Sequence, residues 1–280
     1  MTGSSNAAGG GRAPPPVLID MVGPLMNDQP QISVVVPFHN SERHLAACIE
    51  SLLGQRDVDG PFEVILVDNG STDASASVAE RFEGVFVLEE TVPGAYAARN
   101  TGIRKARAPL IAFTDADCVV APDWLRSIRR GMRDSAIAIQ LGRCSYPPQA
   151  SWALRLLGAY ENAKTDYVIN RCPAAYRFGY TNNMAVRASV FEEIGLFLQW
   201  RRAADSELLH RLASRRPDLR PVYRRSMRVT HMEFLRARDR ARRLSLYART
   251  NSNIETFREL GVAQRAGLLM HLFRGRRAND

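Results

Sequence analysis

Short apolar runs alternate with amphipathic segments through the first 120 residues. The runs are rich in β-branched residues and end at polar or turn-forming positions, which is typical of strands buried on both faces of a parallel sheet. The predicted strands are 32–38, 62–73 with its polar end, 85–90 and 109–117, and the predicted helices between them are 41–55, 74–82 and 93–106. This alternation with short connections predicts an α/β fold with a mostly parallel, doubly wound sheet flanked by helices.

The pattern is less regular after residue 120. It predicts helices at 121–132, 152–169, in the second part of 178–195, and at 204–213. It predicts strands at 136–146, early in 178–195, and at 222–232, the last as an edge strand. Two further helices are expected to close the chain, at about 234–250 and 262–274.

The two ends of the chain differ from this central part. Residues 1–30 are rich in Gly, Ser and Pro, and we expect them to form a disordered leader. The apolar stretch 17–26 is short and interrupted by Asp20, so it suggests neither a signal peptide nor an anchor. No run reaches the roughly 18 apolar residues that cross a bilayer, and a cytoplasmic protein is expected.

Positive charge is concentrated near the C-terminus. The chain carries a formal net charge of +9, yet residues 201–280 alone hold 20 basic and 8 acidic side chains, and every basic one is arginine. Such a segment suits nucleic acid, an anionic membrane surface or a phosphate-bearing ligand, although coding bias alone also enriches arginine. Four widely spaced cysteines suggest reduced thiols rather than a zinc site or disulfides.

Polar clusters follow three of the predicted strands, at His39-Asn40, Asp68-Asn69 and Asp115–Asp117. Ligands of parallel sheets bind at the carboxyl ends of strands. If the chain stays extended through Asp115 and Asp117, both carboxylates point to the same face and repel each other. A divalent cation such as Mn²⁺ or Mg²⁺ would relieve that repulsion, whereas a solvated acidic turn is the alternative.

Two further positions allow a binding role or a local one. Asp68 lies in a run of turn-forming residues, so it could form an Asx-turn, contact a base or ribose, or do both. Arg99 and Asn100 follow a glycine-containing loop at the start of a predicted helix, where a phosphate could bind. A surface arginine explains Arg99 equally well.

Taken in order, five segments resemble a family 2 glycosyltransferase of the GT-A fold, over residues 31–232. They are ISVVVPFHNSERHLAACIESLLGQ, VILVDNGSTD, PGAYAARNTGI, FTDAD and FGYTNNMAVRASVFEEIG. The resemblance implies transfer of a sugar from a nucleotide diphosphate sugar, with a divalent metal and inversion at the anomeric carbon. It divides the chain into a nucleotide-binding half (31–120), an acceptor-binding half (121–232) and a basic helical C-terminal extension (233–280).

The same resemblance assigns the donor and metal sites residue by residue. It places Asp68 against the base, Arg99 on the nucleotide side, and Asp117 on the metal with Asp115 between ribose and metal. His231 is implied as a further metal ligand, or else as a strand-end histidine with its bonds satisfied. The remaining positions expected to bind the nucleotide sugar are Pro37, His39 (where a tyrosine is common), Asn40, Asn69, Asn100 and Ala116.

For the catalytic base the resemblance implies Asp205, in the stretch AADSELLHRL. An inverting transfer needs one base to take the proton of the attacking hydroxyl. The acidic residue that usually precedes the base is Ala204 here, so Glu207 and Asp166 stay open as alternatives. The departure also leaves open a catalytically silent nucleotide-binding module.

The acceptor side is the least informative part of the sequence. Trp200, Arg201, Asn182 and Asn183 are the candidates for acceptor contacts. From the resemblance we expect an acceptor that is a glycan, a lipid-linked molecule or a small molecule, a UDP-sugar as the favoured donor, and a role in polysaccharide or glycoconjugate biosynthesis. The Gln-x-x-Arg-Trp motif of processive relatives is absent, which favours a single addition.

Apolar residues alternate with arginines in the C-terminal extension, which suits a helix lying on an anionic membrane at the inner face of the cell. An arm packed on the catalytic domain or on a second subunit of a homodimer fits equally well. A nucleic-acid-binding protein is less favoured, because no known motif accompanies the arginines. A nucleotidyltransferase would ordinarily have a Gly-rich basic loop after the first strand, and VPFHNSERH lacks one.

Overall fold

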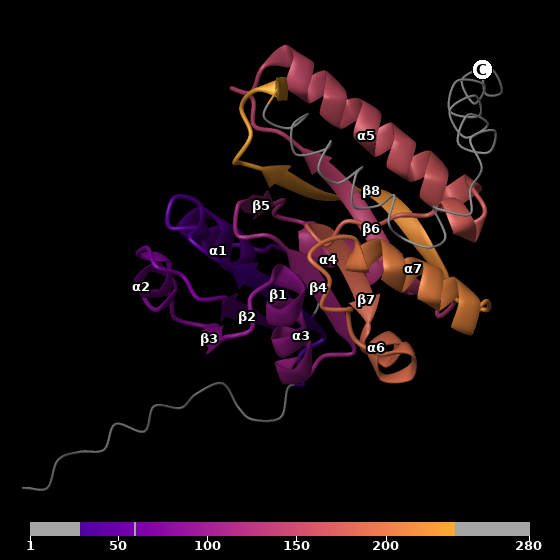
Figure 1. Cartoon of the computed structure of the whole chain (residues 1–280), viewed down its shortest axis with the longest axis horizontal. Coiled ribbons are helices and arrows are strands. Elements are labelled where there is room, and N and C mark those ends of the chain that lie inside the picture. Colours follow the sequence, from indigo (N-terminus) through magenta and orange to yellow (C-terminus); the bar gives the residue numbers. More distant parts are fainter. Residues whose placement is uncertain (1–28, 59, 239–280) are drawn as a thin grey trace, which may run out of the picture.

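The computed structural model describes residues 29–58 and 60–238, which fold around one eight-stranded sheet (Figure 1). The strands are β1 (Ile32–Phe38), β2 (Phe62–Asp68), β3 (Val85–Glu89), β4 (Leu110–Thr114), β5 (Cys118–Val120), β6 (Ile137–Ser145), β7 (Asn183–Arg187) and β8 (Arg220–His231). The helices are α1 (Leu45–Leu53), α2 (Ser75–Ala79), α3 (Ala95–Lys105), α4 (Trp124–Gly131), α5 (Trp152–Arg171), α6 (Ala188–Ile194) and α7 (Ala204–Arg215), with a 3₁₀ turn at Ala174–Tyr176.

The order of strands in the sheet is β3-β2-β1-β4-β7-β6-β8-β5. β1 pairs in parallel with β2 and β4, and β2 pairs in parallel with β3. β7 runs antiparallel to β4 and β6, β6 and β8 are parallel, and β5 runs antiparallel to β8. Six strands therefore share one direction, and the mostly parallel α/β sheet predicted from the sequence is confirmed.

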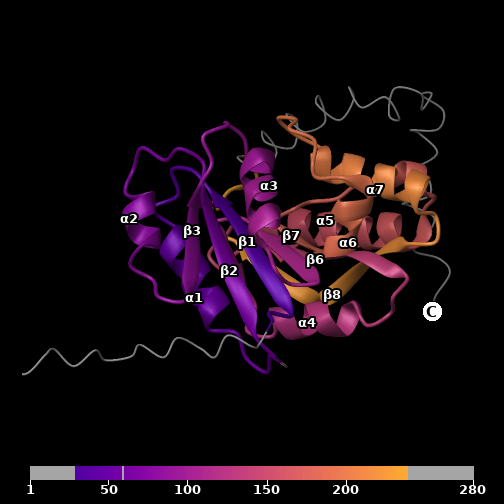
Figure 2. The same cartoon turned by 90° about the horizontal axis from the view of Figure 1, so that it is seen from below.

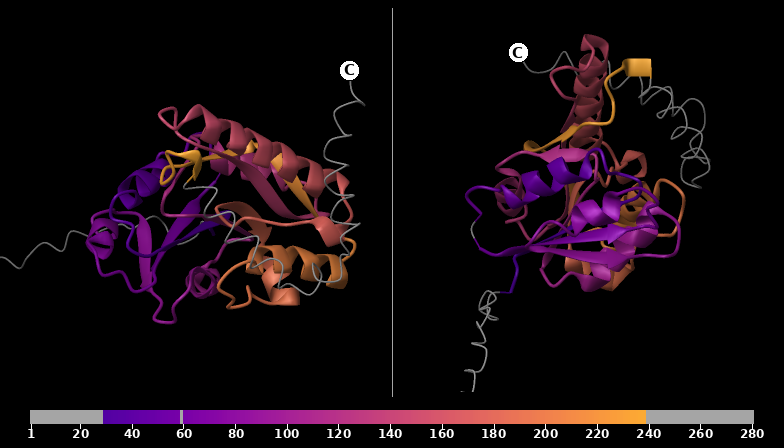
Figure 3. Two further views of the ribbon diagram at one scale, coloured as in Figure 1. Left: turned by 45° about the horizontal axis from the view of Figure 1, so that its top comes forward. Right: turned by 90° about the vertical axis from the view of Figure 1, so that its left-hand side faces the viewer.

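Helices cover both faces of the sheet because its central strands are apolar on both sides. Val34 and Val36 of β1 pack with α1, α2 and α4, and Val35 packs with α3, α6 and α7 on the opposite face. Figure 2 shows these two helical layers with the sheet between them. In both views of Figure 3, α5 lies on the outside of the molecule beside β6 and β8.

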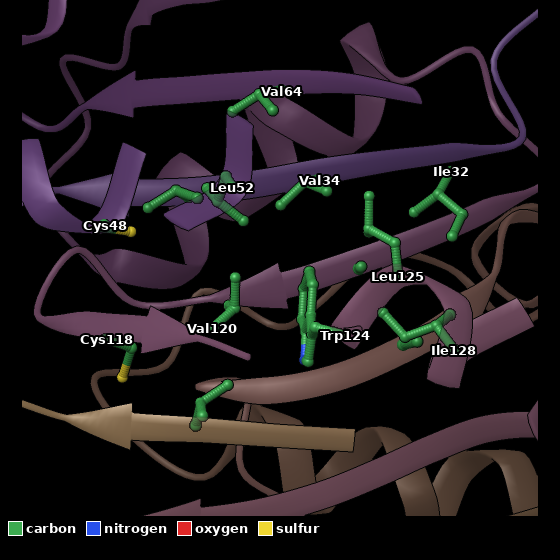
Figure 4. Packing of buried hydrophobic residues seen from close by; sticks show 14 of the residues in the cluster. Ile32, Val34, Cys48, Leu52, Val64, Cys118, Val120, Trp124, Leu125 and Ile128 are labelled. Atoms are coloured by element: carbon green, nitrogen blue, oxygen red, sulfur yellow. The ribbon is translucent and has the colours of Figure 1, made fainter. Parts of the chain in front are cut away.

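Trp124 of α4 is central to the first of these cores. Its side chain is fully buried among Val120, Leu125 and Ile128 (Figure 4). The indole Nε1 donates a hydrogen bond of 2.9 Å to Oδ1 of Asn183 on β7. A polar contact inside an apolar core needs such a partner, so this bond fixes α4 against the middle of the sheet.

Several predicted boundaries are wrong in an informative way. The strand predicted at 109–117 ends at Thr114, and a turn follows in which the Cys118 N–H donates to the Asp115 carbonyl at 3.0 Å. Helix α1 begins at Leu45 rather than at residue 41. The strand predicted at the edge of the sheet, β8, is covered by the short strand β5, which the sequence pattern did not reveal.

Some predictions fall on the ends of the chain. Residues 1–28 of the expected leader, and residues 239–280 with most of the two expected C-terminal helices, lie outside the described residues. Within residues 29–58 and 60–238, no helix combines the length and the apolar character needed to cross a bilayer.

Candidate active site

A cavity of about 800 Å³ opens where the parallel strands end. Its walls come from the segment after β1, the start of α3, the turn 115–117, the loop 178–182, the start of α7 and the end of β8. The predicted site residues that line it are Pro37, His39, Asn40, Asn69, Arg99, Asp115, Ala116, Asp117, Asn182, Arg201, Asp205 and His231. Most of the residues expected from the sequence are thus brought to one place.

On one side of the cavity, loops after β1 and β2 are held together by side chains. The His39 Nδ1 lies 2.9 Å from the Asn69 carbonyl, and the Asn40 Oδ1 accepts from the Thr72 N–H at 2.8 Å. The Asn69 amide donates to the carbonyls of Glu90 and Val92 and accepts from the N–H of Gly94. Gly94 has φ of 130°, a conformation that favours glycine, so Asn69 sets the approach of the chain to α3.

Arg99 lines the cavity beside the acidic turn. It is only 4% exposed and makes an ion pair with the Asp115 carboxylate. Its guanidinium also lies over the Tyr96 ring, 5.4 Å from the ring centroid. A buried cation needs such partners to offset its lost hydration, and the pair therefore holds Asp115 in place.

Asp117 and His231 face each other across the β5–β8 pair. The Asp117 Oδ2 and the His231 Nε2 lie 3.6 Å apart. Pairing of Cys118 with His231 and a 2.8 Å hydrogen bond from the Met232 N–H to the Asp117 carbonyl bring the two residues together. The His231 ring packs against the Phe234 ring at a tilt of 39°, with the centroids 4.8 Å apart.

The chemistry of this pair fits a divalent cation. Asp117, Cys118 and His231 offer ligand atoms that lie within 4.8 Å of one another. In the absence of a cation, burial, together with the nearby Asp117 charge, raises the pKa of the Cys118 thiol well above its usual value. The carboxylate oxygen and the imidazole nitrogen are donors that suit Mn²⁺, whereas Mg²⁺ prefers oxygen alone.

Asp205, in the first turn of α7, lines the same cavity. Its Oδ1 accepts from the Ser206 N–H at 2.9 Å and its Oδ2 from the Thr181 N–H at 3.3 Å. Burial raises the pKa of Asp205 from its usual 3.8 to about 6, although the Arg99 charge and hydrogen bonds from Ser206, Tyr96 and Thr181 oppose the rise. The result is a carboxylate poised near neutral pH.

The structure also separates Asp205 from the two alternative bases. Glu207 makes an ion pair of 3.1 Å with Arg211 and lies outside the cavity lining. Asp166 lies on α5, paired with Arg225 at 2.7 Å, and is also outside it. The methyl group of Ala204 is fully buried in the core, so this position faces away from the cavity.

Four expected site residues lie outside the cavity lining, namely Asp68, Asn100, Asn183 and Trp200. Asn100 and Asn183 require correction, because both amides are buried and bonded within the protein. The Asn100 amide bonds to the backbone N–H and carbonyl of Phe197. Asp68 forms the expected turn, with Oδ1 accepting from the N–H and the hydroxyl of Ser71, and Trp200 is partly exposed on a loop.

Other cavity residues were not anticipated from the sequence. Tyr96 contributes a hydroxyl beside Asp205, and Arg202 and Glu233 add charges to the wall. Tyr96 precedes Arg99 by three positions and so shares its helical face. Tyr96 could have been predicted as a site residue from this spacing. No comparable pattern in the sequence indicates Arg202 or Glu233.

Comparison with known proteins identifies the family. Residues 33–195, more than half of the chain, match the family described as glycosyl transferase family 2. The chain therefore belongs to glycosyl transferase family 2, and its α/β fold is the GT-A fold.

Two curated relatives illustrate the match in sequence. The glycosyltransferase AglE of Haloferax volcanii is 28% identical over 174 residues, which cover 60% of this chain and 56% of AglE. The validoxylamine A glucosyltransferase of Streptomyces hygroscopicus subsp. limoneus is 28% identical over 200 residues, covering 60% of this chain and 44% of that protein. The chain thus spans about half the length of these relatives.

Solved structures share the fold at low sequence identity. The mannosyltransferase PcManGT of Pyrobaculum calidifontis, in complex with GDP-Man and Mn²⁺, has a TM-score of 0.57 and 20% identity, covering 91% of this chain and 66% of that chain. The glucosyl-3-phosphoglycerate synthase of Mycobacterium tuberculosis, in complex with Mn²⁺, UDP and phosphoglyceric acid, has a TM-score of 0.54 and 19% identity. The match covers 78% of this chain and 75% of that chain.

Proposed function

We propose that this protein transfers a sugar from a nucleoside diphosphate sugar to an acceptor hydroxyl, with inversion at the anomeric carbon and with the help of Mn²⁺ or Mg²⁺. The observation that carries the proposal is the content of the cavity. It holds the Asp117–His231 pair on one wall and the buried Asp205 on another. A cation site and a base in one cavity are what a displacement at a sugar diphosphate requires.

Asp205 is the proposed catalytic base. With a pKa of about 6 it is ionised at neutral pH yet more basic than an exposed aspartate. It takes the proton of the acceptor hydroxyl as the oxygen attacks the anomeric carbon. One such displacement, with no enzyme nucleophile, inverts the configuration at that carbon.

Asp117 and His231 are the proposed cation ligands, with Asp115 beside them. The cation, when bound, would stabilise the negative charge of the departing diphosphate. Arg99 holds Asp115 through their ion pair and adds a fixed positive charge beneath the site.

The walls of the cavity come from both halves of the sequence, and each half has a different proposed role in binding. Pro37, His39, Asn40 and Asn69 belong to residues 31–120 and form the proposed nucleotide side. Asn182, Arg201 and Asp205 belong to residues 121–232 and form the proposed acceptor side. Asp68, one residue before Asn69, stays a prediction as the base contact.

A UDP-sugar is the favoured donor and a single addition the favoured mode. Among the solved neighbours, the mycobacterial synthase was crystallised with UDP and Staphylococcus aureus TarS with UDP-GlcNAc, whereas PcManGT was crystallised with GDP-Man. The acceptor classes remain a glycan, a lipid-linked molecule or a small molecule.

Turnover of matched aspartate variants tests the proposal. Nucleoside diphosphate release would be measured with a panel of UDP-, GDP- and dTDP-sugars, Mn²⁺ and acceptors of the three classes. Asp205→Asn should lower the rate by about 10²- to 10⁴-fold, the usual contribution of a general base. Asp166→Asn, which alters an ion-paired carboxylate outside the cavity, should leave the rate nearly unchanged, and an equal effect of both substitutions would refute the assignment.

A further inference from the structure

Helix α5 is apolar on two opposite sides. Its inner side buries Leu154, Val168 and Ile169 against the rest of the protein. Its outer side exposes apolar side chains at spacings of three and four, so they share one face. These are Trp152, Leu156, Ala159, Tyr160 and Ala163.

This exposed face is unusual for a surface helix. The exposed fractions of Trp152, Leu156 and Tyr160 are 72%, 62% and 49%, among the largest of the apolar side chains in the described residues. A surface helix ordinarily carries polar residues on its outer side. Leu235, exposed at 48%, lies at the N-terminal end of α5, where its carbonyl accepts from the Ser151 N–H at 3.0 Å. We call these six residues, the five above and Leu235, the α5 patch.

Basic side chains border the α5 patch. Arg155 is exposed on the same helix, and Arg236 is exposed next to Leu235. Asp166, farther along α5, is neutralised by its ion pair with Arg225. Two further acids lie in this region: Glu161, half-buried on α5, and Glu233, which is exposed and belongs to the wall of the cavity. An apolar centre containing Trp and Tyr with an arginine fringe complements an anionic lipid surface.

The size of the α5 patch suits a functional surface. Its exposed apolar side chains offer on the order of 400 Å², a typical size for a functional surface patch. A protein interface of about 800 Å² on each partner is itself only a little more than half apolar, so area alone does not distinguish lipid from a second copy of the chain. The exposed arginines beside the α5 patch favour an anionic lipid surface.

We propose that the α5 patch docks the protein onto a membrane containing anionic lipids, with Trp152, Leu156 and Tyr160 entering the interfacial layer. The α5 patch also lies near the cavity, because Phe234 shares a hydrophobic cluster with Leu154 of α5 and packs against His231. Docking there would hold the cavity close to the lipid surface. The docking itself does not depend on the proposed glycosyl transfer, and it can be tested without any sugar donor.

Vesicle flotation of the full chain tests the proposal. The protein would be mixed with vesicles of phosphatidylcholine alone, or with vesicles that also contain about 30 mol% phosphatidylglycerol. Anionic lipid is expected to stabilise binding by on the order of 1 kcal/mol for each basic residue near the surface. We expect flotation with the anionic vesicles, weakened by salt. The double variant Trp152→Ala/Leu156→Ala should reduce the bound fraction at least about tenfold, given two large side chains removed from the layer.

Phe86→Ala is the matched control, since Phe86 is exposed at 42% on the opposite edge strand β3. It should float like the unaltered protein. Circular dichroism would show that the exposed substitutions preserve the fold. Equal flotation of the double variant and the unaltered protein would overturn the proposal, as would no flotation of either.

Tryptophan quenching provides a second, local measurement. The chain has three tryptophans, of which Trp124 is fully buried. In the Trp200→Phe variant, brominated lipid should therefore quench chiefly Trp152. A lack of quenching, or a change of oligomeric mass instead of vesicle binding in the double variant, would show that something other than lipid covers the α5 patch.

Discussion

At the scale of single residues, the proposed chemistry depends on the surroundings of Asp205. Burial raises the pKa of this carboxyl group to about 6, and Arg99, the Ser206 N–H, Tyr96 and the Thr181 N–H limit the rise. The Tyr96 phenol itself has its pKa raised well above the usual value by burial, so it remains a hydrogen-bond donor. The Tyr96 hydrogen bond therefore favours the charged form of Asp205, the proposed base.

The pH profile of turnover should report this arrangement. The ionised base is active, so activity should fall as the pH drops through about 6. Tyr96→Phe removes a hydrogen bond to the carboxylate, which raises the pKa of Asp205 and moves the acid limb of the profile to higher pH. Tyr167→Phe on α5 is the control, and an unmoved or lower acid limb in Tyr96→Phe would contradict the role given to its hydroxyl.

Motifs in the sequence pointed to Asp117, Asp205 and His231, and the structure gathers all three in one cavity. The burial and the hydrogen-bond partners of these side chains could not be predicted from the sequence. The preference of Asp205 over Glu207 depends on which carboxylate enters the cavity, and both lie in the first turn of the same helix. The directions of the Asp205 and Glu207 side chains depend on how α7 packs against the core.

At the scale of elements, Asn183 joins three parts of the second half of the sheet. Its amide donates to the carbonyls of Arg143 on β6 and Met227 on β8, at 2.9 and 3.0 Å, and accepts from Trp124 of α4. The pairing of β6 with β8 shifts register between Gly142 and Arg143, beside this amide. Asn183 thus satisfies backbone groups that the irregular ladder leaves open.

Neighbouring asparagines should therefore behave differently on substitution. Asn183→Ala leaves buried polar groups unsatisfied and should lower the free energy of unfolding by about 2–3 kcal/mol in urea denaturation. Asn182→Ala, which alters a side chain lining the cavity, should barely change stability and should instead lower turnover. Equal stability of the two variants would mean that the buried amide is not the junction described.

The hydrophobic pattern located most of the elements and missed the short strand β5. β1 is buried along its whole length and β6 over its first five residues, and α5 was recognisable as a helix through its length of 20 residues. β5 has three residues, too few to show any period, and it lies just after the acidic turn. The turn places Asp115 toward Arg99 and Asp117 toward His231, which the expected extended strand would not do.

At the scale of the whole molecule, one sheet spans both proposed halves. β4 from the first half pairs with β7 from the second, and β5 pairs with β8. The cavity therefore draws its proposed nucleotide side and its proposed base from residues far apart in sequence. The fold class could be predicted from the alternation of strands and helices. The pairings of β4 with β7 and of β5 with β8 could not, because strand pairing between distant segments leaves no pattern in the sequence.

A thermal-shift titration tests the central claim most directly, because it asks whether nucleotide and cation bind at this cavity together. UDP, GDP and dTDP would be added to the full chain with and without Mn²⁺, and to Asp117→Asn and the surface control Asp134→Asn. At a concentration of 100 times the Kd, we expect one nucleotide to raise the Tm by about 5 °C or more. The rise should require Mn²⁺, persist in Asp134→Asn and disappear in Asp117→Asn. No shift with any nucleotide, or an equal shift in Asp117→Asn, would contradict the account.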